Sequence, residues 1–159
     1  MYRDAIFSRC QKYRYVLIRE WQSDLPRAAF VMLNPSTADH LKDDPTISRS
    51  IAFAKSWGFG ALDIYNLFAY RSPYPEHLFA QKDPIGPRNY QYLRRLKDNY
   101  GMVLCAWGND GKRMQQEEGF LKRFKQQKLH CLKKNKSGSP AHPLYIRKDV
   151  RPIPYKAGE

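Results

Sequence analysis

The sequence lacks the features that mark membrane, secreted and disulfide-stabilised proteins. It contains no run of 18 apolar residues, so we expect no transmembrane helix and no membrane partner. Its charged start, "MYRDAIFSRCQKYRY", has none of the apolar character of a signal peptide. The three cysteines, Cys10, Cys105 and Cys131, are odd in number and far apart, which excludes a disulfide framework and a metal-ligand spacing. These absences predict a reduced, cytoplasmic protein.

The sequence also lacks the short motifs of several enzyme classes. "GNDG" resembles a phosphate-binding turn, but it lacks the Lys-Ser/Thr ending of a P-loop and the spacing of a dinucleotide-binding fingerprint. The sequence has no G-x-S-x-G motif of a serine hydrolase and no His/Glu motif of a zinc enzyme. We therefore expect neither a metal nor a cofactor.

Positive charge is abundant and unevenly placed. The chain has 28 Lys and Arg against 15 Asp and Glu, a formal net charge of +13. Residues 112–159 alone hold 13 Lys and Arg against 4 Asp and Glu, interleaved with Tyr, Phe and His. Such a concentration indicates a polyanionic partner, although a solvated basic surface would look the same. Candidate contacts to a nucleic-acid backbone are Lys133, Lys134, Lys136, Arg147 and Lys148.

Strand-like and helix-like segments alternate after the first 27 residues. Short apolar runs such as "AAFVML" are typical of strands covered on both faces. Amphipathic stretches lie between them, which predicts an α/β fold with a central parallel sheet and helices on both faces. We expect a single domain, 1–159, with an N-terminal β extension at 1–27, an α/β core at 28–148 and a tail at 149–159.

Polar residues follow each of the expected core strands. Ligands of parallel α/β sheets bind beyond the carboxyl ends of the strands, so these residues should meet at one rim. The first strand ends in Asn-Pro-Ser-Thr, the second in an Asn with Tyr-Arg beyond it, the third in Gly-Asn, and the fourth leads to a His. The candidate rim residues are Asn34, Pro35, Ser36, Thr37, Asn66, Tyr70, Arg71, Gly108, Asn109 and His142.

Three of these residues have side chains suited to chemistry on a nucleobase. Asn66 lies in an apolar run, where its amide needs partners and can read a base edge. Asn34 precedes a proline and either terminates the strand in a turn or orients a water molecule. His142 lies in a loop of small residues and can stabilise a developing anion.

The order of these motifs resembles that of the uracil-DNA glycosylase superfamily. "MLNPS", "IYNLFAYRSPYP", "VLCAWG" and "AHPLYIR" are similar to its successive strand-end motifs over residues 28 to 148. The resemblance implies a three-layer sandwich around a parallel four-stranded sheet, here with an N-terminal β hairpin. The sequence also resembles an uncharacterised bacterial family with "LNPSTAD" near its start and "HPLY" near its end.

The resemblance implies a hydrolase that releases a flipped base from nucleic acid, DNA more than RNA, and acts as a monomer. In that reading Phe68 or Tyr70 stacks on the base, Asn66 reads its edge, and Asn34 orients the attacking water. His142 then stabilises the leaving base. Two alternatives stay open, a non-catalytic DNA- or RNA-binding protein and an enzyme acting on free nucleotides or nucleosides.

Overall fold

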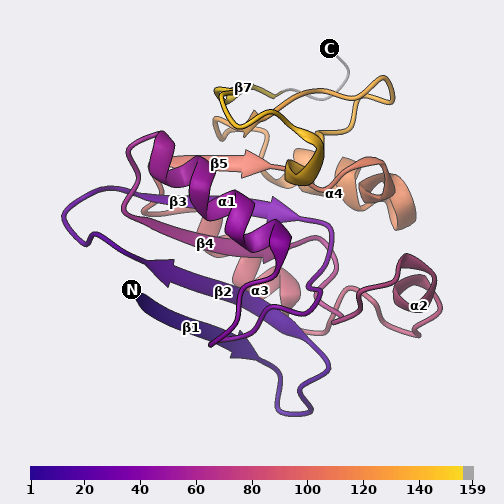
Figure 1. The fold of residues 1–159 in the computed structure, drawn as a ribbon. Coiled ribbons are helices and arrows are strands. Elements are labelled where there is room, and N and C mark those ends of the chain that lie inside the picture. The colour runs from indigo at the N-terminus through magenta and orange to yellow at the C-terminus, as the bar shows by residue number, and fades with distance from the viewer. Residues whose placement is uncertain (156–159) are drawn as a thin grey trace.

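Seven strands form one mixed sheet in the computed structural model, which describes residues 1–155 (Figure 1). Parallel pairings join β3 to β4, β3 to β5 and β5 to β6. The remaining pairings, β1 with β2, β2 with β4 and β6 with β7, are antiparallel. Across the sheet the order is β1-β2-β4-β3-β5-β6-β7. The strands are β1 (Tyr2–Phe7), β2 (Arg14–Glu20), β3 (Arg27–Met32), β4 (Ala61–Asn66), β5 (Met102–Cys105), β6 (His130–Cys131) and β7 (Ile153–Pro154).

The sheet is larger than the expected four parallel strands with a separate hairpin. The N-terminal hairpin continues the sheet, because β2 pairs with β4 in a register that sets Leu17 beside Ile64. This pairing supplies hydrogen-bond partners to a strand edge that would otherwise be unpaired. At the opposite side, β7 pairs with β6, so part of the expected tail 149–159 also joins the sheet. Residues 156–159 of that tail lie outside the described residues.

The central strand β3 is buried from its second residue to its last. Ala28, Ala29, Phe30 and Val31 are all 0 % exposed, as the continuous apolar run predicted. Phe30 lies beside Ile64 of β4 on one side and Leu104 of β5 on the other. Because both faces are covered, the polar chain that follows β3 is held at a fixed place at the carboxyl end of the sheet.

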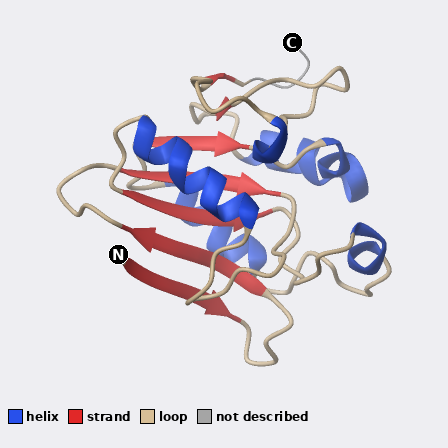
Figure 2. Cartoon of the chain, viewed as in Figure 1, coloured by secondary structure: helices blue, strands red, loops and turns tan. Residues whose placement is uncertain are grey.

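Helices cover the two faces of the sheet (Figure 2). The helix α1 packs on one face through Ile51 and Ala54, in a cluster with Phe30. On the other face, Leu93 of α3 and Phe120 of α4 pack in a second cluster. The α-helices are α1 (Pro45–Ser56), α2 (Pro75–Phe79), α3 (Asn89–Leu93) and α4 (Gln116–Arg123), and the 3-10 helices are η1 (Arg94–Lys97), η2 (Asn109–Gln115) and η3 (Pro143–Tyr145). None of the helices in residues 1–155 has the length and hydropathy needed to cross a bilayer.

The amphipathic pattern of residues 112–127 predicts a helix with Met114 on its inner face, but α4 begins only at Gln116. Met114 and Gln115 have φ of 53° and 56°, so the backbone turns out of the helical path between η2 and α4. Met114, which the pattern placed in the core, is instead 53 % exposed. The periodic pattern could not reveal this break, because neither residue is a glycine or a proline.

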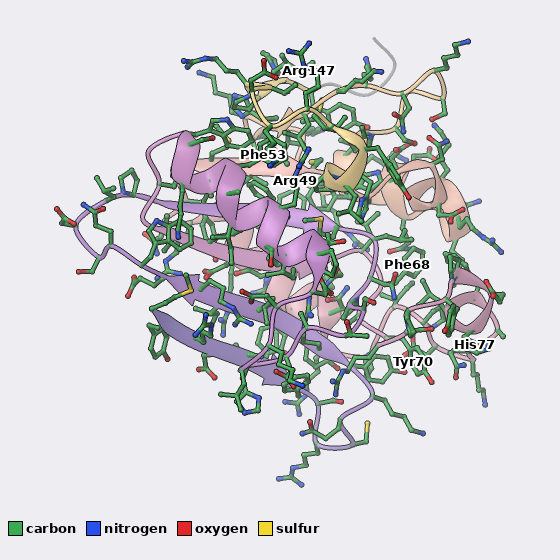
Figure 3. All side chains as sticks on the ribbon, in the orientation of Figure 1. Arg49, Phe53, Phe68, Tyr70, His77 and Arg147 are labelled. Carbon is green, nitrogen blue, oxygen red and sulfur yellow. The ribbon has the colours of Figure 1, made fainter. Side chains whose placement is uncertain are left out.

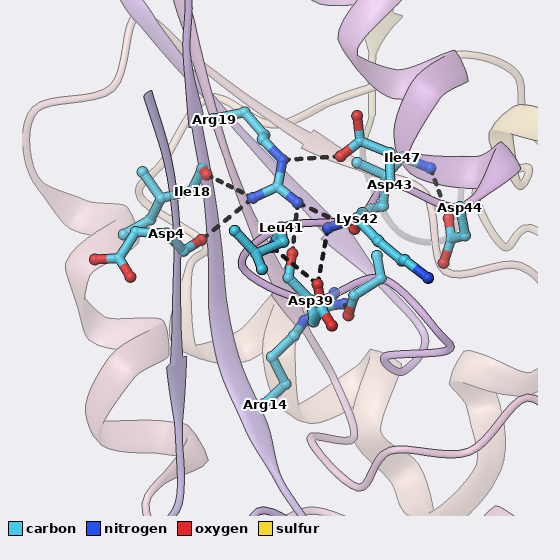
Figure 4. A network of polar contacts seen from close by, with 11 residues as sticks. Asp4, Arg14, Ile18, Arg19, Asp39, Leu41, Lys42, Asp43, Asp44 and Ile47 are labelled. Atoms are coloured by element: carbon cyan, nitrogen blue, oxygen red, sulfur yellow. Dashed lines mark hydrogen bonds and ion pairs between the residues drawn. The ribbon is translucent and has the colours of Figure 1, made fainter. Parts of the chain in front are cut away.

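A buried arginine, Arg19, ties the hairpin to the segment that leads into α1 (Figure 4). Its Nε donates to the Asp43 carboxylate at 2.8 Å, and the pair is an ion pair with the arginine side chain 0 % exposed. The two terminal nitrogens donate to backbone carbonyls of Asp4, Ile18, Asp39 and Lys42. One guanidinium therefore joins β1, β2 and the loop before α1.

Replacing Arg19 with Met should destabilise the protein by about 3–5 kcal/mol. The substitution leaves the Asp43 carboxylate without its buried partner and several backbone carbonyls without a hydrogen-bond donor. The measurement is urea unfolding followed by circular dichroism. Arg3, exposed on the neighbouring β1, provides the control, and Arg3→Met should change stability by no more than about 0.5 kcal/mol. Equal stabilities of the two variants would contradict the role of Arg19.

Candidate functional site

A cavity of about 570 Å³ lies at the carboxyl ends of the parallel strands. Its walls come from the ends of β3 and β4, from the chain after β5, from the start of α1 and from η3. The structure thus brings residues from all four expected strand ends to one rim. Of the predicted site residues, those in the wall are Asn34, Ser36, Asn66, Gly108, Asn109 and His142.

Asn66 is buried in this wall with its side-chain amide unpaired. The residue is 1 % exposed, and neither Oδ1 nor Nδ2 has a hydrogen-bond partner among residues 1–155. Its backbone carbonyl accepts from Nδ2 of Asn89 at 2.8 Å, and the same Nδ2 donates to the Leu67 carbonyl at 3.1 Å. Asn89 therefore fixes the backbone beneath Asn66, while the Asn66 amide keeps one donor end and one acceptor end for a ligand.

Asn34 closes the end of β3 through its amide nitrogen. Nδ2 donates to the carbonyls of Pro35 at 2.9 Å and Ser72 at 2.8 Å, with a longer contact to Tyr70 at 3.4 Å. These bonds link the strand end to the loop after β4, which matches the turn interpretation of this residue. They also fix the orientation of the amide, and its Oδ1 makes no hydrogen bond within residues 1–155.

His142 presents Nε2 as its remaining polar atom. Nδ1 accepts a hydrogen bond from the Leu144 backbone N–H at 3.3 Å, so the neutral ring carries its proton on Nε2. Burial lowers the pKa of His142, and the negative charge of Asp44 opposes that shift only in part. The loop itself is anchored to α1 by a hydrogen bond from Arg49 to the Ile146 carbonyl. At neutral pH His142 is therefore an uncharged hydrogen-bond donor.

Trp107 contributes to the wall of the cavity, and its side chain is 1 % exposed and packed in the core. Its Nε1 donates to the Glu117 carboxylate at 2.9 Å, whose second oxygen accepts from Lys112 at 3.0 Å. Phe120 packs against the indole edge-to-face with ring centroids 5.1 Å apart. These contacts hold the indole in one orientation, as a planar ligand would require.

Two charged residues in the wall, Arg14 and Asp44, were not among the predicted site residues. The sequence favours Asp44 as a helix cap over a partner for a cation or an arginine, and it caps α1, with Oδ1 accepting from Ile47 N–H at 2.9 Å. Arg14 was read only as part of an alternating strand. It reaches the rim because β2 runs antiparallel to β4, so that its first residue lies beside the end of β4. No feature of the sequence predicted the antiparallel pairing of β2 with β4.

Other predicted residues lie away from the cavity. Phe68 is 0 % exposed and packs against Phe79 in the core. Pro35 is buried and accepts a hydrogen bond from Ser72 N–H. A second hollow adjoins the cavity and shares Ser36 with it, and Thr37, Tyr70 and Arg71 line this hollow.

The predicted backbone-binding residues occupy two surface segments, one after β6 and one after η3. Lys133, Lys136, Arg147 and Lys148 are exposed, and Lys134 is half-buried. Figure 3 shows Arg147 on the segment after η3, where it pairs with Asp149 at 2.8 Å. Among residues 1–155, no group of three His, Cys, Asp or Glu side chains gathers where it could share a metal ion.

The sequence profile of a family described as "Protein of unknown function (DUF1643)" matches residues 14–144, and the chain belongs to that family. The matched segment begins at Arg14 and ends at Leu144, so it contains every cavity residue described above. No curated protein and no solved structure matched the chain.

The position of the Trp107 indole depends on the close approach of the Gly111 backbone. A Cβ at this position would lie 2.0 Å from Trp107 Cδ1, so Gly111→Ala should displace the indole and cost about 1–3 kcal/mol. Thermal unfolding and near-UV circular dichroism measure the two effects. Gly119, in α4 with no atom within 4 Å of an added Cβ, is the control. Gly119→Ala should raise stability by roughly 0.5–1 kcal/mol; an unshifted near-UV spectrum in Gly111→Ala would refute the expected displacement.

Proposed function

We propose that this protein binds a nucleobase in the cavity and hydrolyses the N-glycosidic bond that joins it to a sugar. The observation that carries the proposal is the Asn66 amide, buried and unpaired on both its polar atoms. Burying an amide without hydrogen bonds costs on the order of 1–3 kcal/mol. A ligand edge with one donor and one acceptor side by side, as nucleobases have, removes that cost.

The surrounding walls fit a flat heterocycle. Trp107 contributes a firmly packed residue to the wall, and the cavity volume of about 570 Å³ is within the usual range for small-molecule sites. At the cavity mouth, Tyr145 is 89 % exposed and Leu144 is 40 % exposed. Exposed apolar side chains beside a base-sized cavity support entry of a base that has left a nucleic-acid stack.

Bond cleavage requires stabilisation of the leaving base and removal of a proton from water. His142 donates from Nε2 to the base as negative charge develops on it. Asn34 Oδ1 orients the water, whose oxygen attacks the sugar carbon as the bond to the base nitrogen breaks. An amide is too weak a base to take the water proton. The Asp44 carboxylate lines the same cavity and takes it, and the departed base later gains a proton from solvent.

Base release should fall by about 10²–10³-fold in His142→Ala, because the donor to the leaving base is lost. The substrates are single- and double-stranded oligonucleotides that carry uracil, hypoxanthine, xanthine or a thymine mismatch, and alkaline cleavage of abasic sites is the readout. Parallel reactions with the free nucleosides and nucleotides, followed by chromatography, test the alternative substrate class. His77, exposed on α2 and not among the residues that line the cavity, gives the control variant His77→Ala. Equal activity of the two variants would exclude His142 from the reaction.

Asp44→Asn separates the two roles of Asp44. Asn is as good a helix N-cap as Asp, so α1 should keep its start and the protein its stability. The amide cannot take a proton, so base release should fall about 10²-fold or more. Thermal unfolding and single-turnover base release are measured on the same sample. Retained activity in this variant would move the general-base role away from Asp44.

A further inference from the structure

The chain buries two arginine side chains completely, and they differ in how their charge is satisfied. Arg19, 0 % exposed, has an ion pair with Asp43 and four backbone carbonyl partners. Arg14, 2 % exposed, has one hydrogen bond, from Nη1 to the Ala38 carbonyl at 2.9 Å. Its Nε has no partner, and none of the ion pairs within residues 1–155 includes it. A buried guanidinium with most of its donors unused is unfavourable unless an anion binds it.

Arg14 lies where a ligand can reach it, because it is part of the wall of the cavity that Asn66 also lines. Its backbone N–H donates to the Ala69 carbonyl, which holds the residue beside the end of β4. Ser36 lines the same cavity and also borders the second hollow with Lys12 and Arg71. Hydroxyl and guanidinium donors of this kind are the usual partners of phosphate oxygens.

The acidic residues near Arg14 form no ion pair with it within residues 1–155. Oδ1 of Asp39 accepts from the backbone N–H groups of Leu41 and Lys42, each at 2.8 Å. Oδ1 of Asp44 accepts from Ile47 N–H. Both carboxylates attract the Arg14 charge, while Arg71 and Arg19 repel it, and burial lowers the Arg14 pKa to about 10. Arg14 therefore stays protonated at neutral pH.

We propose that Arg14 binds a phosphate group of the ligand whose base contacts Asn66, so that the substrate is a nucleotide and not a bare nucleoside. This inference rests on the proposed base-binding function and names the substrate class of the same cavity. Since Arg14 is 2 % exposed, a phosphate on an uninterrupted duplex surface cannot reach it. The phosphate belongs either to a free nucleotide or to a nucleotide flipped out of a nucleic acid.

Calorimetric titration of the full chain with matched ligand pairs tests the proposal. The probes are uridine against UMP, inosine against IMP, and inorganic phosphate. The wild type should bind at least one monophosphate about tenfold tighter than its nucleoside, as a charge-assisted phosphate contact provides. In Arg14→Met this ratio should fall to about one, and Arg14→Lys should keep part of it because the charge remains.

Folding controls come from the same pair of arginines. Arg14→Met should unfold at the wild-type temperature or above it, since it removes a poorly satisfied buried charge, whereas Arg19→Met should unfold at a clearly lower temperature. If circular dichroism shows that Arg14→Met does not fold, the ligand comparison is repeated with Arg14→Lys, which keeps the positive charge.

The two sources of phosphate and the two proposals give separable outcomes. Single-stranded oligonucleotides with one uracil or hypoxanthine distinguish the sources. If Arg14→Met weakens the affinity for these oligonucleotides more than the affinity for UMP or IMP, the phosphate belongs to a nucleic acid. The reverse result assigns it to a free nucleotide. Asn66→Leu should weaken base-containing ligands and spare inorganic phosphate, so base recognition can fail while the phosphate site stands. The phosphate site is refuted by equal affinities for nucleosides and monophosphates, by no binding of any phosphate-bearing probe, or by a preference that survives Arg14→Met.

Discussion

The guanidinium of Arg19 is the interaction on which the arrangement of the site depends. It is fully buried, so each donor needs a partner, and the partners come from β1, β2 and the loop before α1 (Figure 4). That loop has no regular secondary structure and little apolar surface to hold it. Its path is set instead by where its carbonyls must meet Arg19. Asp44 follows directly, so the start of α1 and one wall of the cavity are placed by the same contact.

The opposite wall is placed by a second buried polar side chain, Asn89. It uses Nδ2 to hold the Asn66 and Leu67 carbonyls where β4 gives way to the loop. Without these bonds, the end of β4 could turn away from the cavity where its pairing with the neighbouring strands stops, and the Asn66 side chain would move with it. Because the backbone is fixed, the amide stays in the cavity wall without a partner of its own. One buried amide thus holds the backbone through its Nδ2, and the other keeps both of its polar atoms unpaired in the cavity wall.

The sequence allowed prediction of the parts of the fold that follow local rules. Fully buried strands such as β3 have continuous apolar runs, and α1 begins with an Asp and a Pro at the expected places. Those rules also placed Asn34, Asn66 and His142 at the carboxyl ends of strands, and all three line the cavity. The parallel order of the strands then brings together residues that are more than 100 positions apart.

The parts that could not be predicted depend on pairing between distant segments. Nothing local to "YRYVLIREW" specifies that β2 joins β4 antiparallel, yet this pairing alone carries Arg14 to the rim. For the same reason Phe68 and Tyr70 looked like stacking residues, although Phe68 faces the core and Tyr70 the adjoining hollow. The aromatic ring residue in the cavity wall is instead Trp107, whose indole is held by Glu117 across a backbone break that no glycine or proline marks.

Arg14, Asn66 and His142 share one physical property, which is that each keeps hydrogen-bonding capacity unused in a largely buried place. For Arg14 and Asn66 the unused atoms are themselves buried. Such groups lower stability, and a cavity that holds several of them is better suited to a polar ligand than to apolar packing. Hydrogen bonds to the backbone at or near each residue, from Arg14 N–H to Ala69, from Asn89 to Asn66 and from Arg49 to Ile146, limit how far the cavity can collapse to relieve the cost. A ligand with an anion near Arg14 and a donor–acceptor edge near Asn66 would supply the hydrogen bonds that these buried groups lack in the free protein. The two proposals therefore share one physical cause, although mutations can separate them.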